Sequence, residues 1–352
     1  MAGGTPSRHF PYREPVFRPP ASDFILSEVH VLRNNLTKSG TLASGGVQYR
    51  TVSFWKRLWM QKQLMLMSVP MLLYILLFNY FPVWGWITAF MNYNPAKPLF
   101  SNEWVGMENF VWLFSKPEFL RAIRNTFAMA AINLVFGFVF PILLALFLNE
   151  IRSTHFKRSI QTITYLPHFL SWVIVVGIAQ TMFASDGAMN RLLLSLGLVK
   201  APVFFLGEGK YFWWLVGGIN LWKECGWNTI IYLAAMSAID PALYEAADMD
   251  GAGRYKKMFH ITLPGIRSTF MVLLVMNIGY LMEAGFEIQY LMGQNVVMDW
   301  SQTIDIFALK YGITKGQYSR AIAAGIFKSL VSIALMLTAN FTAKRLGEDT
   351  LL

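Results

Sequence analysis

The sequence is poor in charged residues and in cysteine. Asp, Glu, Lys and Arg make up 14% of its 352 residues, and Cys225 is its single cysteine. One cysteine cannot form a disulfide within the chain, and it excludes a metal site built on several thiolates. The five histidines are scattered, and no His-Glu-x-x-His motif of a zinc site occurs. The sequence therefore predicts no metal site.

The motifs of phosphate binding and of nucleophilic catalysis are also missing. The nearest candidate for a Walker-type phosphate loop, Gly207-Glu208-Gly209-Lys210, lacks the four-residue spacing and the following Ser or Thr. No Gly-x-Ser-x-Gly nucleophile elbow is found. We therefore expect no catalytic residue and no cofactor bound by this chain. A membrane-embedded enzyme remains an alternative for which the sequence offers no paired catalytic groups.

Apolar residues dominate the composition. They make up 55% of the chain, and the mean hydropathy is +0.41, far from the average of soluble globular proteins. A helix needs about 20 consecutive, mainly apolar residues to cross a bilayer. Six runs meet this length, over residues 64–90, 127–148, 160–183, 212–237, 266–285 and 321–341. The sequence therefore predicts an all-α polytopic membrane protein with six transmembrane helices. Pro141 and Pro167 interrupt two of these runs, which membrane helices tolerate.

The N-terminal segment differs from the rest of the chain. Residues 1–54 contain several prolines and scattered arginines but no apolar run, so we expect no cleavable signal peptide. We interpret this segment as a flexible cytoplasmic tail. An origin from an upstream start codon, without a role, is the alternative. The remaining chain is expected to comprise the first span with an extracytoplasmic loop over residues 55–120, and five further helices over residues 121–345.

Lysine and arginine predict the orientation. With the N-terminus inside, the inner segments hold more of these residues than the outer segments, although the inner loops are short. We therefore expect the protein in the cytoplasmic membrane, with both termini in the cytoplasm. The net charge of +10 is explained by this bias, so a nucleic-acid partner is not needed.

A polar island over residues 240–264 separates the fourth and fifth predicted spans. Asp240 suits the cap of a helix that begins at Pro241. Good helix formers follow, and Gly251 then permits a break before a second, basic helix. With the orientation above, this island is a cytoplasmic loop, and its small alanines would let another surface approach closely.

The spacing of this island resembles the EAA loop of permease subunits in binding-protein-dependent ABC importers. The pattern is Glu-Ala-Ala, three residues, Gly, nine residues and then Ile-x-Leu-Pro. The matching positions, together with the adjacent acidic residue, are Glu245, Ala246, Ala247, Asp250, Gly251, Ile261, Leu263 and Pro264. The alternative is an ordinary surface helix-turn-helix between two spans. We refer to residues 240–264 as the EAA-like loop.

The likeness extends from about Trp55 to the C-terminus, and it is closest to the carbohydrate-uptake branch for complex sugars or polysaccharides. Further segments that carry it are Trp104–Phe110, Arg124–Thr126, Tyr165–Phe169, Trp222–Trp227 and Lys344–Glu348. The resemblance implies a type I importer core that docks through its EAA loop onto ATP-binding subunits. It also implies a second homologous permease subunit, two ATPase subunits that bind ATP and Mg, an extracytoplasmic solute-binding protein and a sugar substrate.

Polar and ionisable residues inside apolar spans are costly, so they mark a cavity or a helix contact. In the fourth predicted span such residues recur at spacings of three and four and share one face, at Asn220, Lys223, Glu224, Trp227 and Asn228. The fifth does the same with Asn277, Tyr280, Glu283 and Glu287. Polar groups beside aromatic rings suit a sugar pathway. The alternative is a structural contact between helices, such as a Lys223–Glu283 pair, with Glu287 at the membrane interface.

Two functions in transport therefore remain open. The first is a permease subunit of an ABC importer that moves a sugar by alternating access. The second is a secondary transporter or channel that works alone, but no inverted repeats are evident and the EAA-like loop would then be unexplained.

Overall fold

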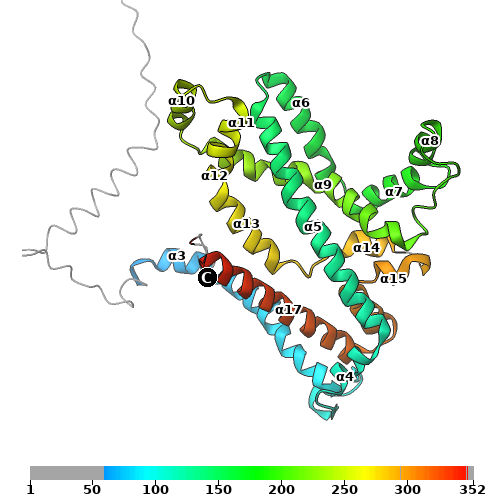
Figure 1. Ribbon diagram of the computed structural model, residues 1–352. Coiled ribbons are helices and arrows are strands. Elements are labelled where there is room, and N and C mark those ends of the chain that lie inside the picture. The colour runs from blue at the N-terminus through cyan, green and yellow to red at the C-terminus, as the bar shows by residue number, and fades with distance from the viewer. Residues whose placement is uncertain (1–58, 294, 346, 348–352) are drawn as a thin grey trace, which may run out of the picture. The chain divides into compact units, whose positions relative to one another are not determined.

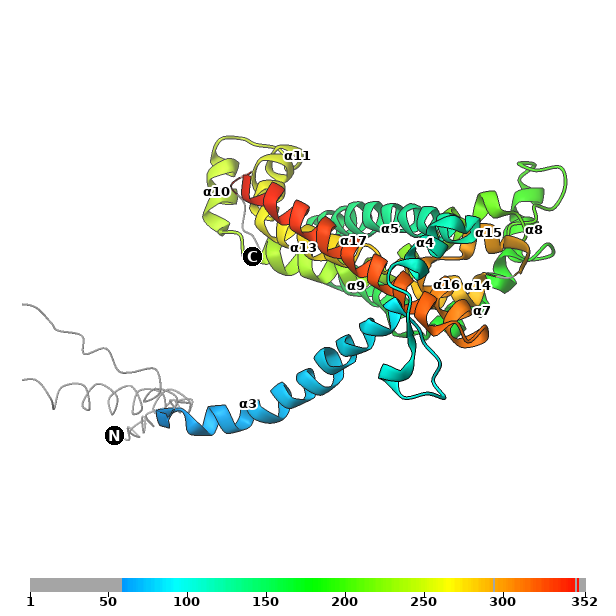
Figure 2. The same cartoon turned by 90° about the horizontal axis from the view of Figure 1, so that it is seen from below.

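The computed structural model describes residues 59–293, 295–345 and 347 (Figures 1 and 2). The predicted tail over residues 1–54 lies outside them. The chain divides into two units, with the boundary between Leu72 and Leu73 inside helix α3 (Lys62–Ile75). All other elements belong to the second unit.

Long helices form the frame of the second unit. They are α5 (Pro117–Glu150), α9 (Gly209–Ser237), α13 (Arg267–Gly279) and α17 (Tyr318–Arg345). Before α5 come η1 (Leu76–Tyr80), η2 (Phe81–Phe90), β1 (Met91–Asn92), η3 (Leu99–Ser101), β2 (Glu103–Trp104) and α4 (Glu108–Ser115). The two short strands pair antiparallel.

Shorter helices connect the long ones. Between α5 and α9 lie α6 (Thr154–Tyr165), η4 (Leu166–Phe169), α7 (Trp172–Phe183) and α8 (Ala188–Ser195). Between α9 and α13 lie α10 (Pro241–Met249), α11 (Arg254–Lys257), η5 (Met258–Thr262) and α12 (Leu263–Gly265). Between α13 and α17 lie α14 (Phe286–Met292), η6 (Asn295–Val297), α15 (Met298–Ser301), α16 (Ile304–Leu309) and η7 (Lys310–Thr314).

The helices are long and apolar enough for a polytopic membrane protein. Among the described residues four helices meet the length and composition of a span, and six do so if each of two bent helix pairs counts as one. The bent pairs are α9 with α10, at 69°, and the helices on either side of Ile266, at 54°. The predicted number of six corresponds to counting each bent pair as one span.

Two predicted spans are interrupted in the structure. The run 160–183 is not one helix, because α6 ends at Tyr165 and the short η4 with Pro167 separates it from α7. Proline lacks an amide hydrogen and cannot continue the helical hydrogen bonds. The run 266–285 is helical only to Gly279, and the segment after it reaches Gly285 at a φ of 82°, in the left-handed region. By contrast, α5 continues through Pro141.

The most extensive helix contact in the second unit is that of α5 with α9. Small residues allow this approach, because a Cβ added at Gly217 would lie 2.5 Å from Cγ2 of Ile132. The Thr229 hydroxyl also donates to the carbonyl of Pro141 across the pair at 3.3 Å. Figures 1 and 2 show α4 at one end of α5 and the region of α10 and α11 at the other. Close contacts at small residues and hydrogen bonds of this kind hold membrane helices together.

Three apolar clusters stabilise the unit. One joins the start of α5 to α16 and α17, another joins α5 to α7, α9 and α14, and the third lies where α5, α9 and α13 meet. Tyr311 belongs to the first cluster and donates to the Glu118 carboxylate at 3.0 Å. Burial, reinforced by this hydrogen bond, raises the pKa of the Tyr311 hydroxyl to about 12, so the phenol stays protonated.

Candidate functional site

The EAA-like loop folds as its local sequence predicts. The Asp240 carboxylate accepts a hydrogen bond from the Ala242 amide at 2.9 Å, and Pro241 is the first residue of α10. This cap satisfies one of the amides that a helix start leaves unpaired, and proline is pre-organised for this position. The predicted cap and helix start are both confirmed.

Gly251 ends α10 in a left-handed turn. Its φ is 69°, and its amide donates to the Asp248 carbonyl while the Ala252 amide donates to the Ala247 carbonyl. These two bonds form a Schellman motif, which favours glycine because other residues are strained at positive φ. The predicted glycine break is therefore a defined turn, and the basic helix α11 follows it.

Two side-chain contacts tie the halves of the loop together. Lys257 of α11 forms an ion pair with Asp248 of α10. The hydroxyls of Tyr244 and Thr262 lie 2.9 Å apart, and Thr262 is buried. The loop is thus a folded unit of its own, held to the ends of α9 and α13.

The motif residues lie mainly on the outside of this unit. Glu245, Ala246, Asp250, Gly251 and Pro264 are exposed, whereas Ala247, Ile261 and Leu263 are half-buried. Large apolar side chains beside the motif are also exposed in this chain, at Leu243, Met249, Tyr255 and Phe259. Met249 is the extreme case, with 89% of its surface accessible. Apolar groups that gather in a polar loop mark a surface that another protein covers.

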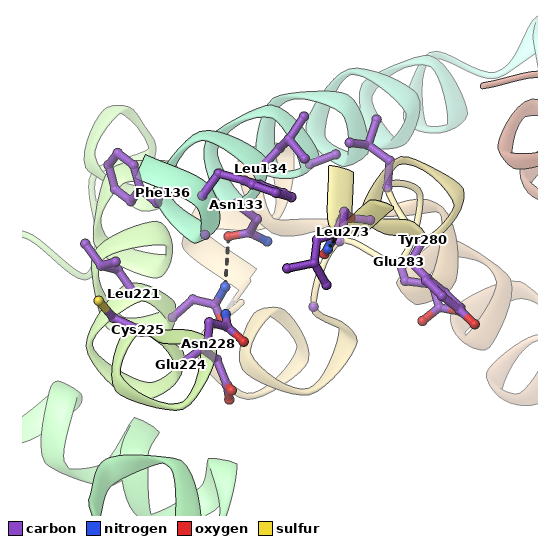
Figure 3. Close-up of a pocket in the computed structure, with 18 of the residues that line it drawn as sticks. Asn133, Leu134, Phe136, Leu221, Glu224, Cys225, Asn228, Leu273, Tyr280 and Glu283 are labelled. Carbon is purple, nitrogen blue, oxygen red and sulfur yellow. Dashed lines mark hydrogen bonds between the residues drawn. The ribbon is translucent and has the colours of Figure 1, made fainter. Parts of the chain in front are cut away.

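A polar cavity of about 340 Å³ lies in the second unit, between α5, α9 and the end of α13 (Figure 3). Of the nine residues on the two predicted polar faces, the structure brings six to this cavity, namely Asn220, Glu224, Asn228, Asn277, Tyr280 and Glu283. Tyr280 and Glu283 reach it from the non-helical segment after α13 rather than from a helix face. Carboxylates and amides within an otherwise apolar helix bundle can bind a hydroxylated ligand.

Helix α5 adds a group that sequence reasoning missed. Asn133 lines the cavity, and its side-chain oxygen accepts a hydrogen bond from the Asn220 amide at 3.1 Å (Figure 3). A single asparagine in the run 127–148 was the available signal. The free Cys225 of α9, which the sequence did not single out for the cavity, lines it too.

Lys223 and Trp227 lie on the flank of α9 that faces η4 instead of the cavity. The Lys223 ammonium is buried, donates to the His168 carbonyl at 2.6 Å and lies 3.3 Å from a Glu224 oxygen. The second Glu224 oxygen lies 2.8 Å from Nδ1 of His168. The His168 ring in turn stacks on the Trp227 indole. We call Lys223, Glu224, His168 and Trp227 the η4 cluster.

The structure differs from two sequence-based expectations. Lys223 forms its ion pair with its neighbour Glu224, and the suggested pair with Glu283 is not formed. Glu287, an exposed residue in the first turn of α14, is not among the residues that line the cavity. Only Glu224 belongs both to the cluster and to the cavity wall, so it connects the two.

Known proteins resemble this chain over most of its length. The model of the family described as "Binding-protein-dependent transport system inner membrane component" matches residues 137–348. Protein LplB of Bacillus subtilis (strain 168) is 43% identical over 85% of this chain and 94% of LplB. The polygalacturonan/rhamnogalacturonan transport system permease protein YteP of the same organism is 44% identical over 82% of this chain and 90% of YteP.

Solved structures give the same result. A bacterial ABC transporter involved in the import of the acidic polysaccharide alginate contains a chain that matches with a TM-score of 0.76 and 39% identity, over 83% of this chain and 98% of that one. A second structure, of the alginate transporter in complex with an alginate pentasaccharide-bound periplasmic protein, matches with a TM-score of 0.78 and 37% identity. It covers 85% of this chain and 99% of the other.

Proposed function

Because the chain belongs to the family of inner-membrane components of binding-protein-dependent transport systems, we propose that it is the permease subunit of an ATP-driven importer for an oligosaccharide. One observation carries this proposal. Helices α9 and α13, which form two walls of the polar cavity, are also the two helices that the EAA-like loop connects. A force applied to the loop would therefore reach the cavity without an intermediate element.

The proposed mechanism is alternating access. ATP draws two ATPase subunits together, the EAA-like loop moves with the subunit on which it is docked, and α9 and α13 change the side to which the cavity opens. The loop then transmits the preference of the ATPase for one of two permease states, which is a coupling free energy between distant sites. This chain binds no nucleotide in the proposal, and ATP and Mg belong to the ATPase partner.

The partners follow from the surfaces of the chain. The exposed apolar residues of the EAA-like loop, together with Glu245, form the proposed contact with an ATPase subunit. A second homologous permease subunit would complete the pathway beside the cavity, and an extracytoplasmic solute-binding protein would deliver the sugar. The complex of the alginate transporter with a periplasmic protein supports the last of these partners.

The orientation belongs to the same proposal. The bias of lysine and arginine supports a topology with both termini and the EAA-like loop in the cytoplasm. The solute-binding protein would then approach the side of α4 and α8. Sugar as the substrate class is supported by the amides, carboxylates and tyrosine of the cavity and by the carbohydrate named for YteP.

The proposal is tested by uptake in cells that express the complete transporter. Gly251→Pro requires a negative φ where the turn has 69° and removes the amide bonded to Asp248, and Glu245→Lys reverses the exposed charge of the motif. Both variants should insert into the membrane, lose uptake and co-purify less ATPase. Gly253→Ala is the matched control, because Gly253 has a φ of −70° and open space around it.

Two outcomes would contradict the proposal. Uptake at the wild-type rate in the double variant Gly251→Pro, Glu245→Lys would exclude a coupling role for the loop. Flux of sugar through the purified chain in vesicles without any ATPase would instead support a secondary transporter or channel.

A further inference from the structure

The charged side chains on the cavity wall all have the same sign. Among the described residues that line the cavity, Glu224 and Glu283 are ionisable acids, and neither lysine nor arginine is present. The other polar groups are mainly asparagine amides, at Asn133, Asn220, Asn228 and Asn277. Amides donate and accept hydrogen bonds, but they carry no charge that could neutralise an anion.

The two carboxylates differ in how they are compensated. Glu224 is paired with Lys223 at 3.3 Å and contacts His168 at 2.8 Å. The Lys223 ammonium is itself buried and donates to the His168 carbonyl of η4, so it is not available to a ligand in the cavity. Glu283 is exposed towards the cavity and forms no ion pair with any residue of the described chain. Its negative charge is therefore available to a ligand.

The end of α13 adds to this negative potential. The helix ends at Gly279, next to the segment that carries Glu283, and its carbonyls at Asn277 and Ile278 accept hydrogen bonds from the Tyr280 and Leu281 amides of that segment. A helix C-terminus has the effect of about half a negative charge. Inside a protein such charges act more strongly than in bulk water.

We propose that Glu283 is a specificity determinant of the pathway, which makes this chain's wall of the cavity favour uncharged oligosaccharides and repel uronates. The inference rests on the function proposed above and names its substrate class. The alginate and polygalacturonan systems, to which this chain is similar, have acidic named substrates, so the experiment below compares an acidic with an uncharged sugar.

The native cysteine allows the potential of the cavity to be measured directly. Cys225 lines the cavity and is the single cysteine of the chain. In the complete transporter in lipid nanodiscs, Cys225 would be treated with a cationic trimethylammonium and an anionic sulfonate methanethiosulfonate of similar size. Modification is followed on the Cys225 peptide by mass spectrometry. The ratio of the two rates cancels the intrinsic reactivity of the thiol.

We expect the ratio of the cationic to the anionic modification rate to be about tenfold higher at Cys225 than at an exposed reference site. Ser195→Cys on α8, in a Cys225→Ser background, supplies this reference, because Ser195 is exposed and distant in sequence from the lining residues. Glu283→Gln should lower this rate ratio at Cys225 by at least about threefold. A ratio at Cys225 equal to that at the reference site would overturn the proposal, and so would a ratio unchanged in Glu283→Gln.

Protection by sugars gives a second readout. An uncharged xylotetraose should slow the modification of Cys225 more than tetragalacturonate, and Glu283→Gln should narrow the difference. Stronger protection by tetragalacturonate in the unaltered protein would overturn the proposal. If the protein were not a sugar permease, neither sugar would protect, whereas the rate ratio of the two reagents would still report the charge of the cavity.

Discussion

The imidazole of His168 lies parallel to the indole of Trp227, with ring centroids 4.4 Å apart and an angle of 2° between the planes. Phe169 contacts the same indole edge-on at 5.7 Å. The stack joins η4, where the third predicted span is broken, to the middle of α9. Trp227 therefore has a structural partner within the chain, which favours the interpretation of this residue as a contact between helices over that as a sugar platform.

Trp227→Ala should destabilise the transporter by about 0.5–1.5 kcal/mol beyond the loss of buried area, the range for an aromatic pair. Trp227→Phe keeps a ring for stacking and should retain most of the stability. The measurement is the midpoint of thermal unfolding of the complex in nanodiscs, together with uptake. An unchanged midpoint with lost uptake in Trp227→Ala would instead assign the ring to the sugar pathway.

Lys223 should be worth more to stability than an exposed lysine of the same helix. Its side chain is 6% exposed and compensates Glu224, whose side chain is 26% exposed. Lys223→Met leaves a half-buried carboxylate with His168 as its remaining contact, so we expect a loss of about 3 kcal/mol, the low end for a broken buried pair.

The control for Lys223 is Lys210→Met. Lys210 also forms an ion pair on α9, with Glu208, but both side chains are largely exposed, and the unfolding midpoint should not change. The double variant Lys223→Met, Glu224→Gln should recover part of the loss. A Lys223→Met midpoint equal to that of Lys210→Met would show that the pair has no structural role.

Local chemistry made the EAA-like loop predictable from the sequence. The cap by Asp240 and the turn at Gly251 depend on neighbours within a few residues, and both lie where the sequence places them. The ends of interrupted spans were less predictable. Hydrophobicity continues past Gly279, so composition alone extended the fifth span to residue 285, where the backbone is no longer helical.

The cavity was predictable in part, for a geometric reason. At 3.6 residues per turn, Glu224 and Asn228 lie on one flank of Asn220, and Lys223 and Trp227 lie on the other. Their spacing in the sequence predicts a single polar face for all five. In the fold the two flanks have different neighbours, because one borders the cavity and the other packs on η4. The position of η4 depends on tertiary packing, which periodicity does not contain.

The orientation of the chain gives a third prediction. Met249→Cys, at the exposed tip of α10, should resist a membrane-impermeant thiol reagent in intact cells, whereas Ser195→Cys on α8 should react. Both are made in a Cys225→Ser background so that the introduced thiol is the only one in the chain. The bias of lysine and arginine is the reason for this expectation. Labelling of Met249→Cys from outside would reverse the proposed topology.

Lys328 and Asp305 form an ion pair that the sequence did not reveal, because the two residues are 23 positions apart and belong to α17 and α16. The ammonium lies 2.7 and 2.8 Å from the two carboxylate oxygens, and the side chains are 18% and 29% exposed. A pair with both oxygens engaged and limited access to water should hold the first half of α17 against α16.

Removal of either partner of this pair should lower the stability by about 3 kcal/mol, because the other charge is left half-buried and unpaired. Lys328→Met and Asp305→Asn are the single variants, and the double variant should recover most of the loss, since no unpaired charge remains. Arg121→Met is the matched control, because its ion pair with Asp299 is exposed and should contribute at most about 1 kcal/mol. Thermal unfolding of the complex in nanodiscs measures all four. Additive losses in the double variant would show that the two residues act independently, and the contact would then have no part in joining α16 to α17.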